Sequence, residues 1–145
     1  WPGRLEVISK DPFILLDGAH NLMAARNLAT YLARDLADRP ITLVAGILDD
    51  KPYAAMLGVL LPLCRRVILT RATIERALPP ERLAEVAADQ IADITVRPTV
   101  GDALGYAIET VGSDEVICVA GSLYVVGEAR EILERDGYPA PSASA

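Results

Sequence analysis

Residues 41–70 read ITLVAGILDDKPYAAMLGVLLPLCRRVILT. Two apolar runs rich in β-branched residues, 41–47 and 67–70, flank a segment whose apolar residues recur at helical spacing. Continuous apolar runs of this kind are typical of strands that are covered on both faces, as in a parallel sheet. The stretch therefore predicts a strand, a helix and a parallel strand, with Asp49 or Asp50 as the N-cap of the helix.

The same alternation continues on both sides of this stretch. Further strands are predicted at 5–8, 13–16, 94–96 and 115–120, and further helices at 21–36, 79–87, 99–111 and 122–133. Short connections between alternating strands and helices predict the fold class α/β, with an open, mostly parallel sheet of about six strands and helices on both faces. We expect residues 1–138 to form a single domain, and residues 139–145, rich in Pro, Ser and Ala, to form a flexible tail.

Composition narrows the class of protein. The 145 residues are 52% hydrophobic and 23% charged, enough to bury the core of one domain. Fourteen Lys and Arg against twenty Asp and Glu give a net charge of −6, which argues against a nucleic-acid partner or an anionic membrane. No apolar run reaches about 18 residues and there is no signal peptide, so we expect a cytoplasmic protein. Cys64 and Cys118 lack CxxC spacing and are predicted to be buried free thiols.

Several catalytic signatures are missing from the sequence. It contains no GxxxxGK[ST] phosphate loop, no GxGxxG, no GxSxG elbow and no metal-ligand cluster. The chain also begins at Trp1 without an initiator Met. We therefore expect a fragment of a longer enzyme, with no catalytic nucleophile and no metal site of its own.

Polar residues follow four of the predicted strands. Ligands of open parallel sheets bind beyond the carboxyl ends of the strands, where the helices begin. The segments at these positions are DGAHN (17–21), LDDK (48–51), Arg71 with Arg76, and Gly121-Ser122. They predict a functional edge of the sheet. Arg4 falls outside this set because it precedes its strand.

The DGAHN segment carries the clearest chemistry. Gly18 permits a tight turn, and the helix that follows offers unpaired backbone N–H groups to an anion. Asp17 can accept a hydrogen bond from a ribose or an amine, and His20 can donate to a phosphate oxygen. The alternative is that Asp17 only caps the helix and His20 is a solvated surface residue. The segment by itself slightly favours this alternative.

Other positions at this edge are ambiguous in the same way. Lys51 suits a ligand carboxylate, but Asp49 or Asp50 can also pair with it. Ser122 is well placed to be an N-cap.

Arg71 and Arg76 flank a turn and can hold an acidic substrate. Glu75 is an adjacent partner for an ion pair, and the pattern favours that structural role.

Five segments resemble a known family when they are taken in order. They are WPGRLE (1–6), ILLDGAHN (14–21), GILDDK (46–51), TRATIERALPPE (70–81) and VAGSLYVVGEAR (119–130). Together they resemble the C-terminal domain of folylpolyglutamate synthase/dihydrofolate synthase, in the Mur ligase superfamily. The resemblance runs to about residue 131. One departure is Leu22, because the family usually has Pro after DGAHN.

The resemblance implies a Rossmann-like Mur ligase C-terminal domain from an ADP-forming ligase of folate and one-carbon metabolism. Such an enzyme uses ATP and Mg²⁺ to convert a folate or dihydropteroate carboxylate into an acyl phosphate, which the amine of L-glutamate attacks. The phosphate loop and the Mg²⁺ ligands belong to the N-terminal ATPase domain, the expected partner. By motif, Arg4, Asp17 and His20 would contact ATP. By position, Lys51 and Ser122 would lie near glutamate. We expect the parent enzyme to be a monomer and the fragment alone to be inactive.

A non-enzymatic, receiver-like signalling module is the alternative interpretation. Asp17 and the Asp49-Asp50 pair would then form an acidic phospho-acceptor pocket. A receiver, however, has its acidic pair directly after the first strand and a lysine after a late strand. No lysine follows Lys51 in this sequence, so the pattern favours the ligase.

Overall fold

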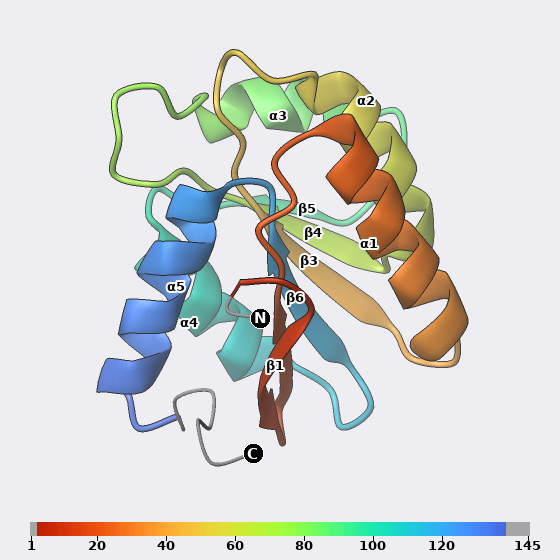
Figure 1. Ribbon diagram of the computed structural model, residues 1–145, viewed down its shortest axis with the longest axis vertical. Coiled ribbons are helices and arrows are strands. Elements are labelled where there is room, and N and C mark those ends of the chain that lie inside the picture. The colour runs from red at the N-terminus through yellow and green to blue at the C-terminus, as the bar shows by residue number, and fades with distance from the viewer. Residues whose placement is uncertain (1–2, 139–145) are drawn as a thin grey trace.

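The computed structural model describes residues 3–138, which form one α/β unit (Figure 1). Its strands are β1 (Glu6–Lys10), β2 (Phe13–Leu16), β3 (Ile41–Ala45), β4 (Arg66–Leu69), β5 (Ile94–Val96) and β6 (Val116–Ala120). Its helices are α1 (Leu22–Asp35), α2 (Tyr53–Leu60), α3 (Pro80–Ala87), α4 (Val100–Thr110) and α5 (Leu123–Arg135), with a 3₁₀ turn at Leu61–Leu63. The tail expected at 139–145 lies outside the described residues. None of the helices described is long and apolar enough to cross a membrane.

The strands form one six-stranded sheet in the order β1-β2-β6-β3-β4-β5. β2, β6, β3, β4 and β5 run parallel, whereas β1 pairs with β2 antiparallel. The prediction of an open, mostly parallel sheet is therefore confirmed. The predicted bounds of β2 and β5 match the observed strands, and the other elements differ at their ends by a few residues.

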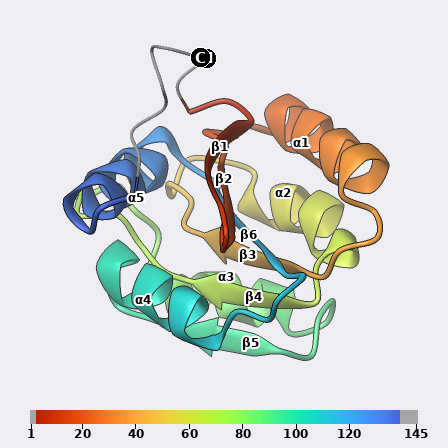
Figure 2. The ribbon, with the colours of Figure 1, turned by 90° about the horizontal axis from the view of Figure 1, so that it is seen from below.

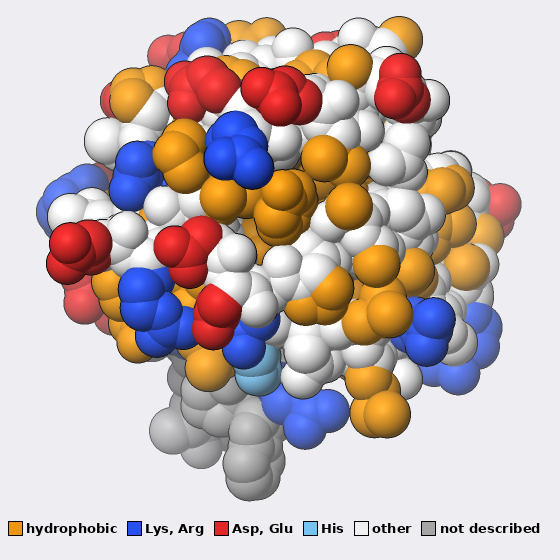
Figure 3. Space-filling view, turned by 90° about the horizontal axis from the view of Figure 1, so that it is seen from above, with side chains coloured by type: hydrophobic (Ala, Val, Ile, Leu, Met, Phe, Trp, Pro, Cys, Tyr) orange, Lys and Arg blue, Asp and Glu red, His pale blue; other side chains and the backbone are white. Residues whose placement is uncertain are grey.

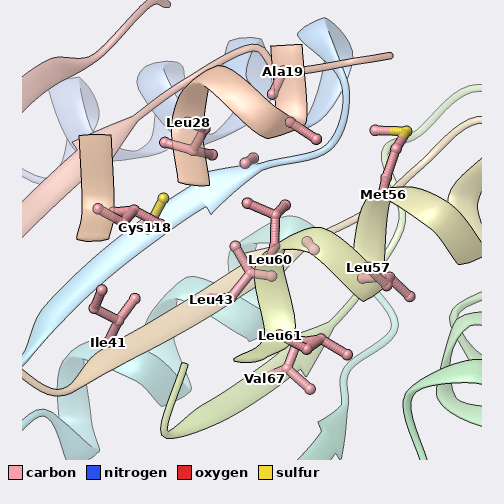
Figure 4. Close-up of a cluster of buried hydrophobic side chains, with 14 of the residues drawn as sticks. Ala19, Leu28, Ile41, Leu43, Met56, Leu57, Leu60, Leu61, Val67 and Cys118 are labelled. Atoms are coloured by element: carbon pink, nitrogen blue, oxygen red, sulfur yellow. The ribbon is translucent and has the colours of Figure 1, made fainter. Parts of the chain in front are cut away.

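Helices cover both faces of the sheet (Figure 2). α1, α2 and α3 pack on one face, and α4 and α5 pack on the other. Along β3 the side chains alternate, so that Leu43 faces the first layer and Val44 faces the second. Figure 4 shows Leu28 of α1 and Met56 of α2 above Leu43 and Cys118. Removing apolar side chains of this size from water contributes roughly 1.5–3 kcal/mol each.

A buried ion-pair network lies at the amino ends of β3, β4 and β6. Arg66 Nε donates to Glu115 Oε2 at 3.0 Å and to Thr42 Oγ1 at 2.6 Å, and Thr42 Oγ1 also bonds Glu115. Arg65, half-exposed, adds a second ion pair to Glu115 at 2.8 Å. This network lies at the edge of the sheet opposite to the candidate site.

The predicted capping of α2 by Asp49 or Asp50 is wrong. The N-cap is Pro52, with no side-chain hydrogen bond. Leu48 forms a β-bridge with Ala77, which ties this loop to the loop after β4. Asp50 thereby lies beside Arg76 and forms an ion pair with it at 3.2 Å.

Both cysteines are free thiols. Cys118 is fully buried between β2 and β3, as predicted, but Cys64 is only half-buried. The Cys64 Sγ donates to the Leu60 carbonyl at 3.3 Å, and burial raises the pKa of this thiol to about 12. A thiol held in its protonated form in this way is unreactive.

Candidate functional site

Two loops meet at the carboxyl ends of β2 and β6. The loop 17–21 leads from β2 into α1, and the loop 121–122 leads from β6 into α5. Asp17 N donates to Val119 O at 2.9 Å, and Gly121 N donates to Ala19 O at 3.0 Å. After the neighbouring strands β2 and β6 the chain leaves toward opposite faces of the sheet, because α1 packs on one face and α5 on the other. Such a divergence opens a crevice between the two helix N-termini, which is where α/β sheets bind ligands.

Arg4 lies at this same edge, contrary to the expectation from the sequence. Because β1 runs antiparallel to β2, the residues that precede β1 lie beside those that follow β2. Gly18 N donates to Gly3 O, and Leu5 N donates to Asp17 Oδ2 at 3.0 Å. The hairpin therefore delivers Arg4 to the DGAHN loop. Leu5 accepts a left-handed φ of 47° in this turn, which L-residues with a Cβ rarely adopt.

A cavity of about 350 Å³ lies between this turn, the DGAHN loop and the first turns of α1 and α5. Its walls bring together all three residues that the resemblance assigns to ATP, which are Arg4, Asp17 and His20. Figure 3 looks onto this edge of the sheet, where basic, acidic and hydrophobic side chains lie around the histidine. A guanidinium, a carboxylate, an imidazole and a helix N-terminus can together recognise a polar, anionic ligand.

Asp17 does not cap α1. The N-cap is Asn21, whose side chain accepts from Ala24 N at 2.8 Å. Asp17 is 8% exposed and accepts from Leu5 N and from Ala19 N, the latter at 2.9 Å. Burial raises the pKa of the Asp17 carboxyl, although these two hydrogen bonds oppose the shift. A carboxylate accepts up to about four hydrogen bonds, so this side chain retains capacity for a ligand hydroxyl.

His20 is half-buried and fixed by its own loop. Its Nδ1 lies 2.9 Å from Gly18 O. Because a carbonyl oxygen only accepts, Nδ1 carries the proton of this bond. The neutral ring then offers Nε2 as an acceptor, and only the imidazolium can donate from Nε2 to a phosphate oxygen. The hydrogen bond ties His20 to its own loop, and the side chain remains partly exposed.

Exposed apolar side chains surround the cavity, and the sequence interpretation missed them. Leu5, Met23, Leu123 and Tyr124 are the large exposed hydrophobic residues of the described chain, and Met23 is 73% exposed. Leu5, Met23 and Leu123 also line the cavity. The available signal was their position, because Met23 and Leu123 stand in first helical turns, where α1 and α5 carry no acidic residue. Apolar side chains gathered at a cavity mark a surface that a ligand or another domain covers.

The two residues assigned to glutamate by position are not in this cavity. Ser122 is buried, and its Oγ accepts from Val125 N at 3.0 Å, so it serves as the N-cap of α5. Lys51 lies in the loop after β3. The expected pairing of Lys51 with Asp49 or Asp50 is not found within residues 3–138, where Asp50 pairs with Arg76 instead.

The arginines after β4 do not share one site. Arg76 pairs with Asp50 at 3.2 Å and not with Glu75, which corrects the expectation from the sequence. Arg71 and Glu75 line a separate, open hollow of about 400 Å³ together with Pro98. Across residues 3–138, no group of three or more His, Cys, Asp or Glu side chains is placed to hold a metal ion.

Comparisons with known proteins identify what this arrangement resembles. The family model for the Mur ligase glutamate ligase domain matches residues 3–123. A probable bifunctional folylpolyglutamate synthase/dihydropteroate synthase of Halobacterium salinarum is 39% identical over 131 residues, covering 90% of this chain and 16% of the relative. The folylpolyglutamate synthase of Lacticaseibacillus casei is 37% identical over 133 residues, covering 92% and 30%.

A solved structure has the same fold. It is the bifunctional folylpolyglutamate synthase/dihydrofolate synthase of Yersinia pestis complexed with AMPPNP and a Mn ion, at 28% identity and a TM-score of 0.84. The match covers 92% of this chain and 32% of that one. The chain thus spans less than a third of the length of these relatives.

Proposed function

The chain belongs to the family of Mur ligase glutamate ligase domains, and from this we propose that it is the C-terminal domain of an ATP-dependent ligase of folate metabolism. In this proposal the parent enzyme joins L-glutamate to a carboxylate of folate or dihydropteroate, and the present domain completes the nucleotide site. The observation that carries the proposal is the cavity that gathers Arg4, Asp17 and His20 at the N-terminus of α1.

The reaction we propose runs in two steps. The substrate carboxylate attacks the γ-phosphorus of ATP, which forms an acyl phosphate and releases ADP. The amine of glutamate then attacks the acyl carbon, and inorganic phosphate leaves as the amide forms. The residues of this chain contribute position and charge and no covalent chemistry.

Each cavity residue has a role that fits its surroundings. Arg4 neutralises phosphate charge. Its guanidinium is available for this role, because no carboxylate within residues 3–138 forms an ion pair with it. Asp17 accepts a hydrogen bond from a ribose hydroxyl. His20, as the imidazolium, donates from Nε2 to a phosphate oxygen while Nδ1 stays on Gly18 O. The first N–H groups of α1 add a partial positive charge.

The rest of the nucleotide site would come from the N-terminal ATPase domain. The described residues supply neither a phosphate loop nor a set of ligands that fits Mg²⁺, so we assign the metal to that domain and derive no step through it. The exposed apolar side chains around the cavity support closure of a second domain over it. Closure excludes water, which would otherwise hydrolyse the acyl phosphate.

For glutamate, Lys51 is the better of the two proposed contacts. Its ammonium has no carboxylate partner among residues 3–138 and can hold a ligand carboxylate. The Ser122 hydroxyl oxygen already caps the helix by accepting from Val125 N, so a bond to a ligand would be its second hydrogen bond. We further propose that the parent is a cytoplasmic monomer. The receiver alternative is disfavoured, because Asp17 lines the cavity while Asp49 and Asp50 do not.

The parent enzyme tests the proposal directly. With ATP, Mg²⁺, L-glutamate and a folate it should form the amide and release one ADP per bond. Arg4→Ala should raise the KM for ATP about tenfold, the scale of one charge-assisted contact. The 145-residue chain alone should release phosphate only at background. Turnover by the pure chain, or a parent that needs no glutamate, would overturn the proposal.

A further inference from the structure

An ion pair joins the last helix to the first strand beside the cavity. Arg130, in the middle of α5, donates from Nη1 to Glu6 Oε2 at 2.9 Å and from Nη2 to Glu6 Oε1. The two residues are 124 positions apart in the chain. This two-pronged geometry fixes the orientation of both side chains, which a single contact does not.

Glu6 passes this constraint on to the turn that carries Arg4. Its Oε1 accepts from Gly3 N at 2.9 Å. On the other side of the turn, Leu5 N donates to Asp17 Oδ2 at 3.0 Å. Two carboxylates thus hold the backbone N–H groups on both sides of Arg4, and Arg130 orients one of them.

The turn needs these bonds because its backbone is unfavourable. Gly3 has a φ of 75° and Leu5 a φ of 47°, both in the left-handed region. For Leu5 this conformation is costly and persists only where surrounding contacts impose it. Without them the turn would relax and take the Arg4 side chain away from the cavity.

The pair is also built to stay ionised. The Glu6 side chain is 8% exposed and the Arg130 side chain 21%. The hydrogen bonds from Arg130 hold the pKa of the Glu6 carboxyl below its usual range, although burial opposes the shift. Glu6 is therefore a carboxylate at neutral pH, with two acceptor oxygens for Arg130 and for Gly3.

We propose that Arg130 and Glu6 are positioning residues for the nucleotide, which hold the turn 3–5 so that Arg4 faces the cavity. This inference rests on the proposed function. Neither residue lines the cavity, so both act through Arg4. The role also explains how Glu6 and Arg130, 124 positions apart in the chain, serve one site.

Kinetics of the parent enzyme test the role. Arg130→Met should raise the KM for ATP about tenfold and leave kcat and the KM for glutamate within about twofold, because only the placement of Arg4 changes. Arg130→Lys, which restores the charge with a single bond, should recover part of this loss. The control is Arg65→Met, which removes an ion pair to Glu115 at the opposite edge of the sheet and should leave the KM for ATP unchanged.

Amide hydrogen exchange of the 145-residue chain is the second readout, and it does not depend on turnover. Arg130→Met should speed exchange at Gly3 and Leu5, whereas Arg65→Met should not. An unchanged KM for ATP in Arg130→Met, or unchanged exchange at both amides, overturns the inference. A wild-type parent without ATP-dependent ligation would refute the proposed function instead, and the exchange result would still decide whether Arg130 holds the turn.

Discussion

His20 offers the sharpest single-residue test of the site. Its ring is hydrogen-bonded to its own loop, through Nδ1 and Gly18 O, and it lines the cavity. We expect His20→Ala in the parent enzyme to lower kcat/KM for ATP at least about tenfold, the scale of one lost charge-assisted contact. The melting temperature should change little, because a half-buried residue before a helix supports little of the core.

The matched control is His20→Asn, whose amide can still donate to Gly18 O. If this variant keeps the wild-type melting temperature and still loses activity, the Nε2 edge of His20 is what the ligand uses. Full activity in His20→Ala together with a clear loss of stability would make His20 a structural residue only.

Two carboxylates on either side of Arg4 should respond to acid with opposite signs. Arg130 holds the pKa of Glu6 below its ordinary value of 4.5, so Glu6 stabilises the fold above that pH and the contribution disappears as the pH falls. Burial raises the pKa of Asp17 above 3.8, so its ionised form costs stability at neutral pH and protonation relieves that cost.

Thermal melts from pH 7 down to about pH 2 measure this difference, because the Glu6 contribution is lost only as the pH falls below 4.5. Glu6→Gln should flatten the acid-side loss of stability, and Asp17→Asn should steepen it. If the melting temperatures of both variants and the wild type change with pH in the same way, the assignment of these shifts to Glu6 and Asp17 is refuted.

The residues of the cavity could be predicted from the sequence only in part. DGAHN drew attention to Asp17 and His20 because a carboxylate and an imidazole before a helix are suited to bind nucleotides. The assignment of Arg4 to the site came only from the resemblance to the family. Its neighbourhood depends on the antiparallel pairing of β1, a long-range property that local residue patterns do not encode.

Gly121 shows how closely the elements approach at the carboxyl edge. It has a φ of 115°, and a Cβ there would lie 2.3 Å from the carbonyl oxygen of Gly46. Gly121→Ala should therefore destabilise the fold by about 2 kcal/mol or more, because strain and a backbone clash add. The variant should also disturb the loop that bonds Ala19 and hence the cavity.

Gly127, in the helix α5 that follows Gly121, provides the control for this substitution. It lies in α5, where a Cβ would meet nothing within 4 Å. Gly127→Ala should stabilise the chain by about 0.5–1 kcal/mol, the difference in helix propensity. Denaturant melts compare the two variants, and equal effects would show that the close approach at Gly121 does not matter.

Strands and helices were predictable because both faces of the sheet are buried. Continuous apolar runs and helical stripes follow directly from that burial, and they located the central strands β3 and β6. The capping of α2 was not predictable. Asp50 prefers Arg76, a partner from another loop, and the bridge between Leu48 and Ala77 that brings them together leaves no local signal.

At the scale of the molecule, the proposed function makes the cavity one half of a nucleotide site. It offers one guanidinium, one imidazole and the partial charge of a helix N-terminus, without an enclosing phosphate loop. A few exposed charge-assisted contacts barely offset the cost of immobilising a ligand. ATP should therefore bind the 145-residue chain with a Kd that is roughly millimolar or weaker.

An NMR titration with ATP can locate this weak binding. The largest amide shifts should fall on residues 18–21, smaller ones should appear near Ser122, and added salt should remove both because the contacts are exposed and electrostatic. Ser122 should respond because its loop is bonded to Ala19 through Gly121 N. Arg4→Ala should weaken the shifts, while Arg65→Met, at the far edge, should leave them unchanged.

Two outcomes of this titration would contradict the account of the whole molecule. Micromolar affinity would mean that the chain holds a complete nucleotide site, since two or three exposed contacts cannot supply the roughly 8 kcal/mol that a micromolar Kd requires. Shifts centred on residues 49–51, with none in DGAHN, would mean that the nucleotide binds at the loop after β3 and that the two proposed sites must be exchanged. Lys51 would then face phosphate, and the cavity between α1 and α5 would be left for the amino acid.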